Sequence, residues 1–199
     1  MARRRVEVRR DEILAATISE LESRGLAQTR VSDVASALGI SPGLIFYHFA
    51  TKDALLVAAF ERAVNQDLAL LEVAVRRGTD ATDRLRRVLA VYGPTGAAFG
   101  WRLWIDAWAL ALRNAAIRTT LRRLDDRWRL TLVDVVESGV NDGVFTCEDP
   151  VASVSRVSAL LDGLAVASLS YRNITRTQLR TWVREAMARE LGLDPGVLR

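Results

Sequence analysis

The sequence predicts an all-α protein of about nine helices, and three observations support this prediction. Apolar residues recur at helical spacing along almost the whole chain of 199 residues. Segments with the alternating pattern of a β-strand are almost absent. Short turn signals interrupt the helical pattern, as at Gly25, Gly39, Gly78 and Gly93–Pro94.

The first predicted helix covers residues 6–24. Gly25 follows it and suits the left-handed position just past a helix end, where Leu26 can fold back on the last turn. Thr29 is then expected to cap a short helix over residues 31–38.

Two further caps follow. Ser41 and Pro42 have the residue types of an N-cap and first helical position, and they open a short helix that ends near His48. Thr51 is expected to cap a helix that continues into the low seventies.

The second half of the chain predicts longer helices, one of which starts at a second cap-and-proline pair, Asp149 and Pro150. These helices are expected over residues 82–92, 99–114, 115–139, 150–172 and 175–191. We therefore expect two domains, with residues 1–50 forming an N-terminal arm and a small helical domain and residues 51–199 a second helical domain.

Composition narrows the class of protein. Half of the residues are hydrophobic, which is enough for a real core. The sequence contains no run of 18 uncharged apolar residues, and no apolar segment follows the N-terminal arginines, so we expect neither a membrane helix nor a secretory signal. A single cysteine, Cys147, excludes an intramolecular disulfide framework and favours a reducing, cytoplasmic location.

The excess positive charge lies in the first ten residues, which carry five arginines and one glutamate, whereas the rest of the chain has 23 basic and 23 acidic side chains. A basic arm on a neutral body suggests local contact with a polyanion. A solubilising tail is the alternative.

Residues 31–50, VSDVASALGISPGLIFYHFA, have the features of a helix-turn-helix. Ala35 is small where two short helices would cross, and Gly39 tolerates positive φ in the tight turn between them. The apolar contacts are expected from Val34, Leu38, Ile40 and Ile45. The outer face of the second helix would present Ser41, Gly43, Leu44, Tyr47 and His48 to a DNA major groove. An ordinary helical hairpin does not explain two consecutive short helices with such a face.

The stretch TRVSDVASALGISPGLIFYHFATKDALL resembles the signature of the TetR family, and the resemblance covers residues 13–56. More loosely, residues 99–163 resemble the branch that holds betaine-synthesis repressors, through WRLWIDAWALALRN, GVNDGVF followed by Asp149 and Pro150, and LLDGL. The resemblance implies a homodimer that binds an operator in double-stranded DNA and releases it when a small-molecule effector binds.

The resemblance also implies which residues contact DNA. Thr29, Tyr47 and Lys52 would contact phosphates, and Lys52 is the only lysine beside 27 arginines. The base edges would be approached by Ser41, Pro42, Gly43 and Leu44, and the expected set is completed by Arg30, His48, Arg3, Arg4 and Arg5. His48 either contacts phosphate or packs at the helix end. Phe46 departs from the tyrosine usual in the family, so a phosphate contact is lost there or Phe46 packs.

The helix over residues 99–114 is the most aromatic segment. Trp101, Trp104, Ile105, Trp108 and Leu112 follow helical spacing on one face, and Arg102 and Asp106 are spaced for an ion pair. The indoles either form plain core or line a cavity for a flat apolar or cationic effector, in which Trp128 would share. Asp162, a lone acid in ALLDGLAVA, is either an interface residue or an anion that faces a cationic effector.

The last two predicted helices are expected to form the dimer interface as a four-helix bundle. Small side chains would let the helices approach closely, and Leu160, Leu161 and Leu164 would face the domain core. The expected interface residues are Ser155, Ala159, Gly163, Ala167, Trp182, Val183 and Ala186.

The sequence contains no candidate set of catalytic residues. One histidine and one cysteine form no metal cluster, and no phosphate-binding loop or nucleophile elbow occurs. We expect no enzyme, metal or cofactor. The predicted function is a ligand-responsive DNA-binding regulator, with a helical sensor that acts through protein partners as the alternative.

Overall fold

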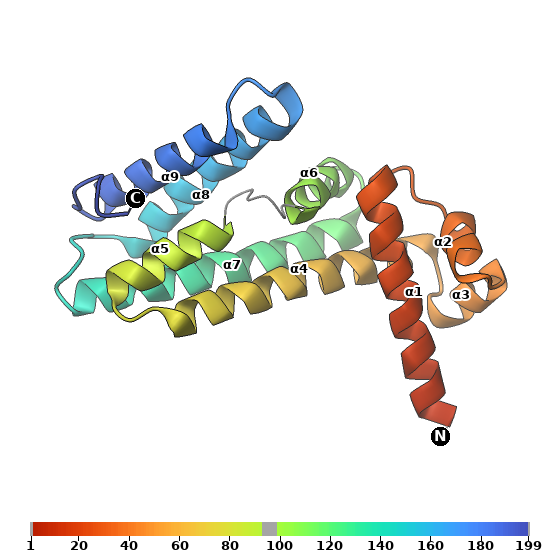
Figure 1. Cartoon of the computed structure of the whole chain (residues 1–199). Helices are drawn as coiled ribbons and strands as arrows, with labels where there is room; N and C mark the ends of the chain where they lie inside the picture. Colours follow the sequence, from red (N-terminus) through yellow and green to blue (C-terminus); the bar gives the residue numbers. More distant parts are fainter. Residues whose placement is uncertain (1, 93–98, 199) are drawn as a thin grey trace. The chain divides into compact units, whose positions relative to one another are not determined.

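The computed structural model describes residues 2–92 and 99–198, with side chains described from residue 6 onward except at 92, 99 and 100. Within these ranges the regular structure is entirely helical (Figure 1), which confirms the predicted fold class. The elements are α1 (Ala2–Arg24), α2 (Val31–Leu38), α3 (Pro42–His48), α4 (Lys52–Arg77), α5 (Ala81–Tyr92), α6 (Phe99–Ala111), α7 (Ala115–Asn141), α8 (Pro150–Val166), the π-helical turn η1 (Ala167–Tyr171) and α9 (Arg176–Glu190).

Three predicted caps are present. The Ser41 hydroxyl accepts the Leu44 N–H at 3.3 Å, and the Thr51 hydroxyl accepts the Ala54 N–H at 3.0 Å. The Asp149 carboxylate accepts the Ala152 N–H at 2.9 Å at the start of α8. Each satisfies one of the backbone donors that the first turn of a helix leaves without an intrahelical partner.

The predicted cap of α2 is wrong. Arg30, not Thr29, is the N-cap residue, and the Asp33 carboxylate in the first turn accepts its N–H at 3.3 Å. Thr29 lies one residue earlier and its hydroxyl donates to the Gly25 carbonyl at 2.9 Å, so it closes the turn after α1. Gly25 and Gly39 have φ of +78° and +63°, as expected for the two turns.

The chain forms two compact units by its internal contacts. Unit 1 contains Met1–Gln66 and Arg102–Leu124, and unit 2 contains Asp67–Trp101 and Asp125–Arg199. The helices α4, α6 and α7 each contribute to both units. The division at residues 50 and 51 remains a prediction.

The core of unit 1 joins the three N-terminal helices to α4 and to the α6–α7 corner, residues 102–124. Its largest fully buried side chains come from both segments, and they are Ile13, Leu26, Ile45, Leu55, Phe60, Leu103, Ile117 and Leu124. The helix-turn-helix thus shares one core with α4, α6 and α7.

Unit 2 contains the antiparallel pair α8 and α9, which lie side by side (Figure 1). The residues that α8 and α9 bury recur at helical spacing, as Val157, Leu161 and Ala165 on α8 and Leu179, Val183 and Met187 on α9. Leu160 was expected in the core but is 38% exposed, because only Leu161 of this pair lies on the stripe that faces inward.

The segment Pro150–Tyr171 is long and apolar enough to cross a membrane by length and composition alone, with a mean hydropathy of 1.3. No membrane-spanning helix was expected from the sequence. Arg156 and Asp162 interrupt it, and Arg156 forms an ion pair with Glu190 of α9. Since charged groups are costly in a bilayer, packing within a helical bundle explains the apolar face of α8 better.

Candidate DNA interface and effector site

The outer face of α3 is open to solvent. Ser41, Pro42 and Gly43 are exposed at its start, Leu44 is half-buried, and Tyr47 is 74% exposed. Ile45, on the opposite side of the helix, is fully buried. A short helix held by one buried anchor therefore presents its remaining side chains outward, as insertion into a major groove requires.

Phe46 is also exposed, at 45%, which disfavours packing, one of the two alternatives for this residue. His48 is half-buried, and its ring meets the Tyr47 ring edge-on with 5.3 Å between centroids. The outer surface of α3 is therefore more aromatic than the predicted contacts alone require.

The residues expected at phosphates differ in accessibility. Arg30 is exposed, and Lys52 is half-buried in the first turn of α4, where the helix N-terminus also favours an anion. Thr29 is only 1% exposed, so its predicted phosphate contact has the least structural support. The side chains of Arg3, Arg4 and Arg5 lie outside the described residues.

Two hydrogen bonds tie the α6–α7 corner to the junctions that flank the helix-turn-helix. The Leu26 N–H, just after α1, donates to Asp106 Oδ2 of α6 at 2.9 Å. The Asn114 amide, between α6 and α7, donates to Asp53 in the first turn of α4 at 2.7 Å. We call these two bonds the corner clamp.

Gly25 allows the first half of the clamp. A Cβ at this position would lie 2.7 Å from Asp106 Oδ2, in addition to the strain of a side chain at φ +78°. Asp106 was expected to pair with Arg102, and the structure instead gives it this backbone partner. Asn114 also accepts the Ile117 N–H at 3.0 Å, so the residue that starts α7 holds the start of α4.

The tryptophans of α6 lie beside the buried face of the helix and not on it. The buried face of the helix is formed by Leu103, Ala107 and Ala111, while Trp101, Trp104 and Trp108 are half-buried beside it. The Trp104 ring meets Phe60 of α4 in a T-shaped contact, with centroids 5.5 Å apart. Leu112, expected on the same apolar face, is 80% exposed because the helix ends at Ala111.

Burial raises the pKa of three half-buried carboxyl groups in unit 2. Burial raises the pKa of Asp162 to about 6, helped by the charge of Asp125, and the nearby Arg129 opposes this rise. Burial also raises the pKa of Asp125, although Arg129 Nε donates to it at 2.8 Å. Burial alone raises the pKa of Asp67 to about 6. One arginine therefore faces the close pair Asp125 and Asp162, which leaves that pair with net negative charge when both ionise.

Sequence reasoning found Asp162 but missed Asp67 and Asp125. Helical spacing contained the signal, because Asp67 is three residues after Val64 and four before Leu71, both fully buried. Likewise Asp125 is three residues before Trp128, which is 6% exposed. An acidic residue that is in helical register with buried apolar residues is a better indicator of a site than an acidic residue considered without its spacing.

The expected interface residues differ in exposure. Ala159, Gly163 and Trp182 are exposed, and a Cβ at Gly163 would meet nothing within 4 Å. Ser155, Ala167 and Ala186 are half-buried, whereas Val183 is 4% exposed and packs inside unit 2. Val183 can therefore support an interface only indirectly, by holding α9 against α8.

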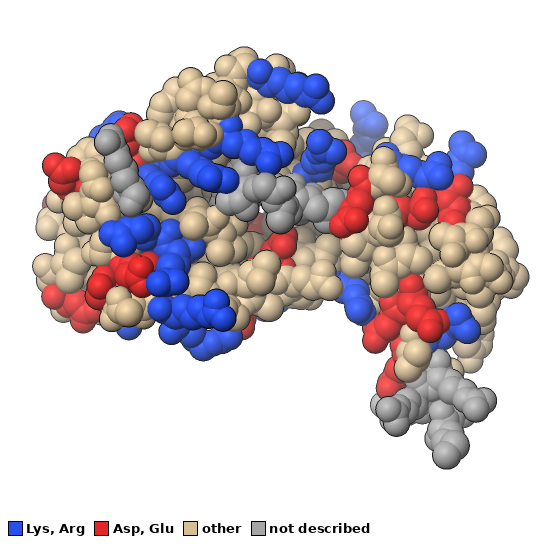
Figure 2. Space-filling view, in the orientation of Figure 1, with Lys and Arg blue, Asp and Glu red and all other residues tan. Residues whose placement is uncertain are grey.

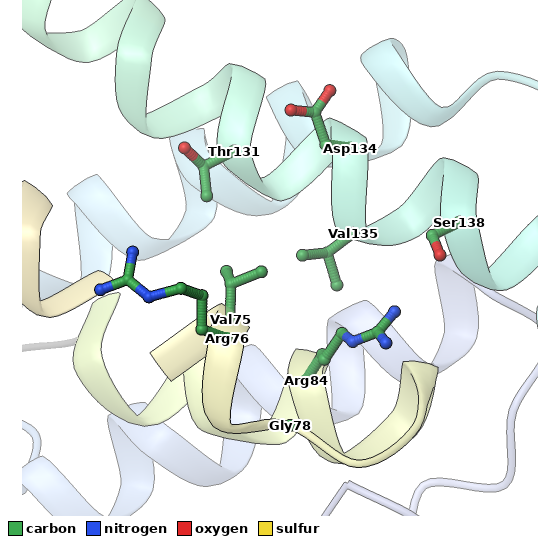
Figure 3. A pocket seen from close by; sticks show the side chains of 8 residues that line it. All are labelled: Val75, Arg76, Gly78, Arg84, Thr131, Asp134, Val135 and Ser138. Atoms are coloured by element: carbon green, nitrogen blue, oxygen red, sulfur yellow. The ribbon is translucent and has the colours of Figure 1, made fainter. Parts of the chain in front are cut away.

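A groove of about 330 Å³ lies within unit 2 where α4 ends and α5 begins (Figure 3). Val75 and Val135 form its apolar part, and the guanidinium ends of Arg76 and Arg84 point to opposite sides. No residue predicted to contact an effector lines this groove.

Comparison with protein families gives two matches. Residues 13–59 match the N-terminal domain of "Bacterial regulatory proteins, tetR family", and residues 81–192 match "BetI-type transcriptional repressor, C-terminal". Among individual relatives, the "HTH-type transcriptional regulator BetI" of Stenotrophomonas maltophilia is 29% identical over 127 residues, which cover 60% of this chain and 63% of that protein. The BetI regulator of Burkholderia ambifaria is 30% identical over 116 residues, covering 56% and 59%. The matches thus span about three fifths of the curated relatives.

Solved structures extend the likeness to nearly the whole chain. A putative transcriptional regulator from Saccharomonospora viridis in complex with choline is 29% identical, with a TM-score of 0.85 over 93% of this chain and 98% of that one. A putative TetR-family regulator from Rhodococcus sp. is 28% identical, with a TM-score of 0.79 over 92% and 98%. The chain therefore belongs to the TetR family of bacterial regulatory proteins, with a C-terminal domain of the BetI type.

Proposed function

We propose that this protein is a transcriptional repressor that binds an inverted-repeat operator as a homodimer and leaves it when a small organic cation binds. It would act in the cytoplasm as a regulator and not as an enzyme. The observation that carries the proposal is one chain with both an exposed recognition helix in unit 1 and the paired carboxylates Asp125 and Asp162 in unit 2.

The DNA half of the proposal rests on α3 and Lys52. A dimer presents two recognition helices related by a two-fold axis, so half-sites are expected about one helical turn apart, or a small multiple of it. Lys52 and the arginines of the arm would neutralise phosphates, which positions α3 without reading sequence.

The effector half rests on charge and aromatic surface in unit 2. A quaternary ammonium has no N–H to donate, so it is recognised by negative charge and by aromatic faces. Asp125 and Asp162 supply the charge, and Trp128 lies one turn after Asp125 on α7. The choline bound by the Saccharomonospora viridis relative is a cation of this class. Trp101, also in unit 2, stays a proposed effector contact, and Trp104 and Trp108, in unit 1, stay predictions from the sequence.

The corner clamp would carry the signal within unit 1. If effector binding favours another placement of α6, then Asp106 and Asn114 move or break their contacts with Leu26 and Asp53. Both junctions of the helix-turn-helix change together, which misplaces α3 for successive grooves and lowers DNA affinity.

The proposal is tested by operator release. Choline would be added to the protein bound to a labelled duplex that carries an inverted repeat selected by this protein, and fluorescence anisotropy would measure release of the DNA. Tryptophan emission would be recorded in parallel. The neutral isostere 3,3-dimethylbutan-1-ol has the same shape without the charge and serves as the control ligand. We expect choline to release DNA and the neutral isostere to have at least tenfold less effect. Equal release by both compounds would contradict a cation site.

The exposed Phe46 favours a second candidate, a helical sensor that acts on protein partners. An exposed aromatic side chain is common at protein interfaces. A salt-dependent gel shift separates the two, since a sensor of that kind would show no saturable DNA complex at any salt concentration.

A further inference from the structure

Basic side chains gather over α5 and α9 within unit 2 (Figure 2). Arg180 and Arg184 are one turn apart on α9 and flank its buried stripe. Arg86 comes from α5, directly after the fully buried Leu85. The three guanidinium groups belong to two helices that are far apart in sequence, so the fold and not a local charge run brings them together.

Arg86 is only partly satisfied. One of its terminal nitrogens donates to the Val197 carbonyl at 2.9 Å, and the other lies 3.9 Å from Asp83. Asp83 is already engaged, because it accepts from Arg87 at 2.7 Å and from the Thr79 N–H at 3.1 Å. Within the described chain, the Arg86 Nε is buried and has no hydrogen-bond partner.

Arg184 is half-buried beside these charges. Burial lowers its pKa, and the neighbouring guanidinium groups of Arg180 and Arg86 lower it further. The nearest acids on α9 have other partners, since Glu185 lies 3.5 Å from Arg189 and Glu190 forms its ion pair with Arg156. In the described residues neither Arg180 nor Arg184 has an ion pair within 4 Å.

Among the described residues, this group of three cations has only Asp83, shared with Arg87, as a counter-ion. Such an excess of positive charge costs free energy, and partial burial raises this cost. Arginine also presents several N–H groups in a planar fork, which suits oxyanions with two or more oxygens. The cluster therefore has what such an anion requires: positive charge from three side chains and a buried donor without an acceptor.

We propose that Arg86, Arg180 and Arg184 form a binding site for a small, multiply charged oxyanion, such as a phosphate group or a polycarboxylate. The site is separate from the carboxylates proposed for the cationic effector and opposite to them in charge. Its occupancy would stabilise the packing of α5 against α9. It does not depend on the proposed function, and its test needs no DNA.

The test is thermal unfolding of the full chain at pH 7.5 in chloride, sulfate, inorganic phosphate or citrate, all at the same ionic strength. For the wild-type protein we expect the multivalent anions to raise the melting temperature by about 2–4 °C over chloride at concentrations several times the Kd. Phosphate and citrate distinguish the two sources of oxyanion, and a larger rise with one assigns the class. Equal melting temperatures in all four salts would overturn the proposal.

Arg184→Gln should remove most of this rise and, in chloride alone, melt at or above the wild-type temperature because it relieves repulsion. Arg180→Gln, at an exposed position that cannot disturb packing, should weaken the rise as well. Arg176→Gln, also exposed on α9, is the matched control and should keep the full rise. An Arg184→Gln protein that keeps the rise, or that melts lower than wild type in chloride, would contradict the site.

Discussion

Replacing Asp162 with asparagine removes a charge that unit 2 holds at an energetic cost. Burial raises the pKa of Asp162 from 3.8 to about 6. One pKa unit corresponds to about 1.4 kcal/mol, so full ionisation in the folded protein costs about 3 kcal/mol, and about 1.5–3 kcal/mol after allowance for partial exposure. Asparagine has nearly the same shape without this cost.

The sign follows from linkage. A carboxylate with a raised pKa contributes no penalty well below pH 3.8, where both the folded and the unfolded chain hold the proton. As the pH rises from about 4 to about 6, the free energy of unfolding of the wild-type protein falls, because the unfolded chain releases the Asp162 proton before the folded chain does. Asp162→Asn should therefore increase the free energy of unfolding by about 1.5–3 kcal/mol at pH 7.5 and by almost nothing at pH 4.

Urea unfolding followed by circular dichroism, at one fixed protein concentration, measures this difference at pH 7.5, 5 and 4. Asp126→Asn is the matched control, since Asp126 is exposed on the same helix as Asp125, and it should change stability by less than about 0.5 kcal/mol. The same Asp162→Asn protein should bind choline at least tenfold more weakly. A variant that is less stable at pH 7.5, or equally altered at all three pH values, would refute a buried charge held for a ligand.

Four further changes test other parts of the account. Lys52→Ala should weaken binding to all DNA sequences alike and reduce the slope of log K against log salt by about one, and an unchanged slope would exclude the phosphate contact. Removal of residues 1–5 should weaken operator binding with unchanged thermal unfolding, and equal affinity would leave the arm as a solubilising tail. Gly163→Leu places a bulky side chain on an open face and should shift sedimentation from dimer to monomer without unfolding unit 2, whereas a stable dimer would place the interface elsewhere. Asp106→Ala should lower operator affinity about tenfold, and Asp106→Asn, which keeps an acceptor for the Leu26 N–H, should restore most of it; equal affinities for both variants would contradict the corner clamp.

The helix cap and the turn glycines of the helix-turn-helix region were predictable from the sequence. Ser41 with Pro42 and the left-handed Gly25 and Gly39 depend on backbone constraints within a few residues, so spacing alone identifies them. Thr29 was a wrong prediction for the N-cap of α2. The Asp33 carboxylate accepts the N–H of Arg30, the residue after Thr29, so the helix starts one residue later than a Thr29 cap would place it.

Long-range contacts could not be predicted in the same way. The bond from Leu26 to Asp106 joins residues 80 positions apart, and helical spacing favoured the Arg102 partner that lies on the same helix. Leu160 and Leu112 are exposed although both are apolar, because the sequence shows that a face is apolar and not what covers it. The predicted contacts to DNA, effector and partner subunit remain predictions.

Selection of duplexes from random-sequence DNA tests directly whether this protein is a dimeric operator-binding repressor. The account predicts enrichment of one inverted repeat, with half-site centres about 10 base pairs apart or at a small multiple, bound by an even number of chains. A Tyr47→Ala protein, altered at a side chain of α3 that is 74% exposed, should fail to enrich the same sequence while it still unfolds at the wild-type temperature. Recovery of no preferred sequence, or of one without two-fold symmetry, would contradict the assignment of this protein as a dimeric operator-binding repressor.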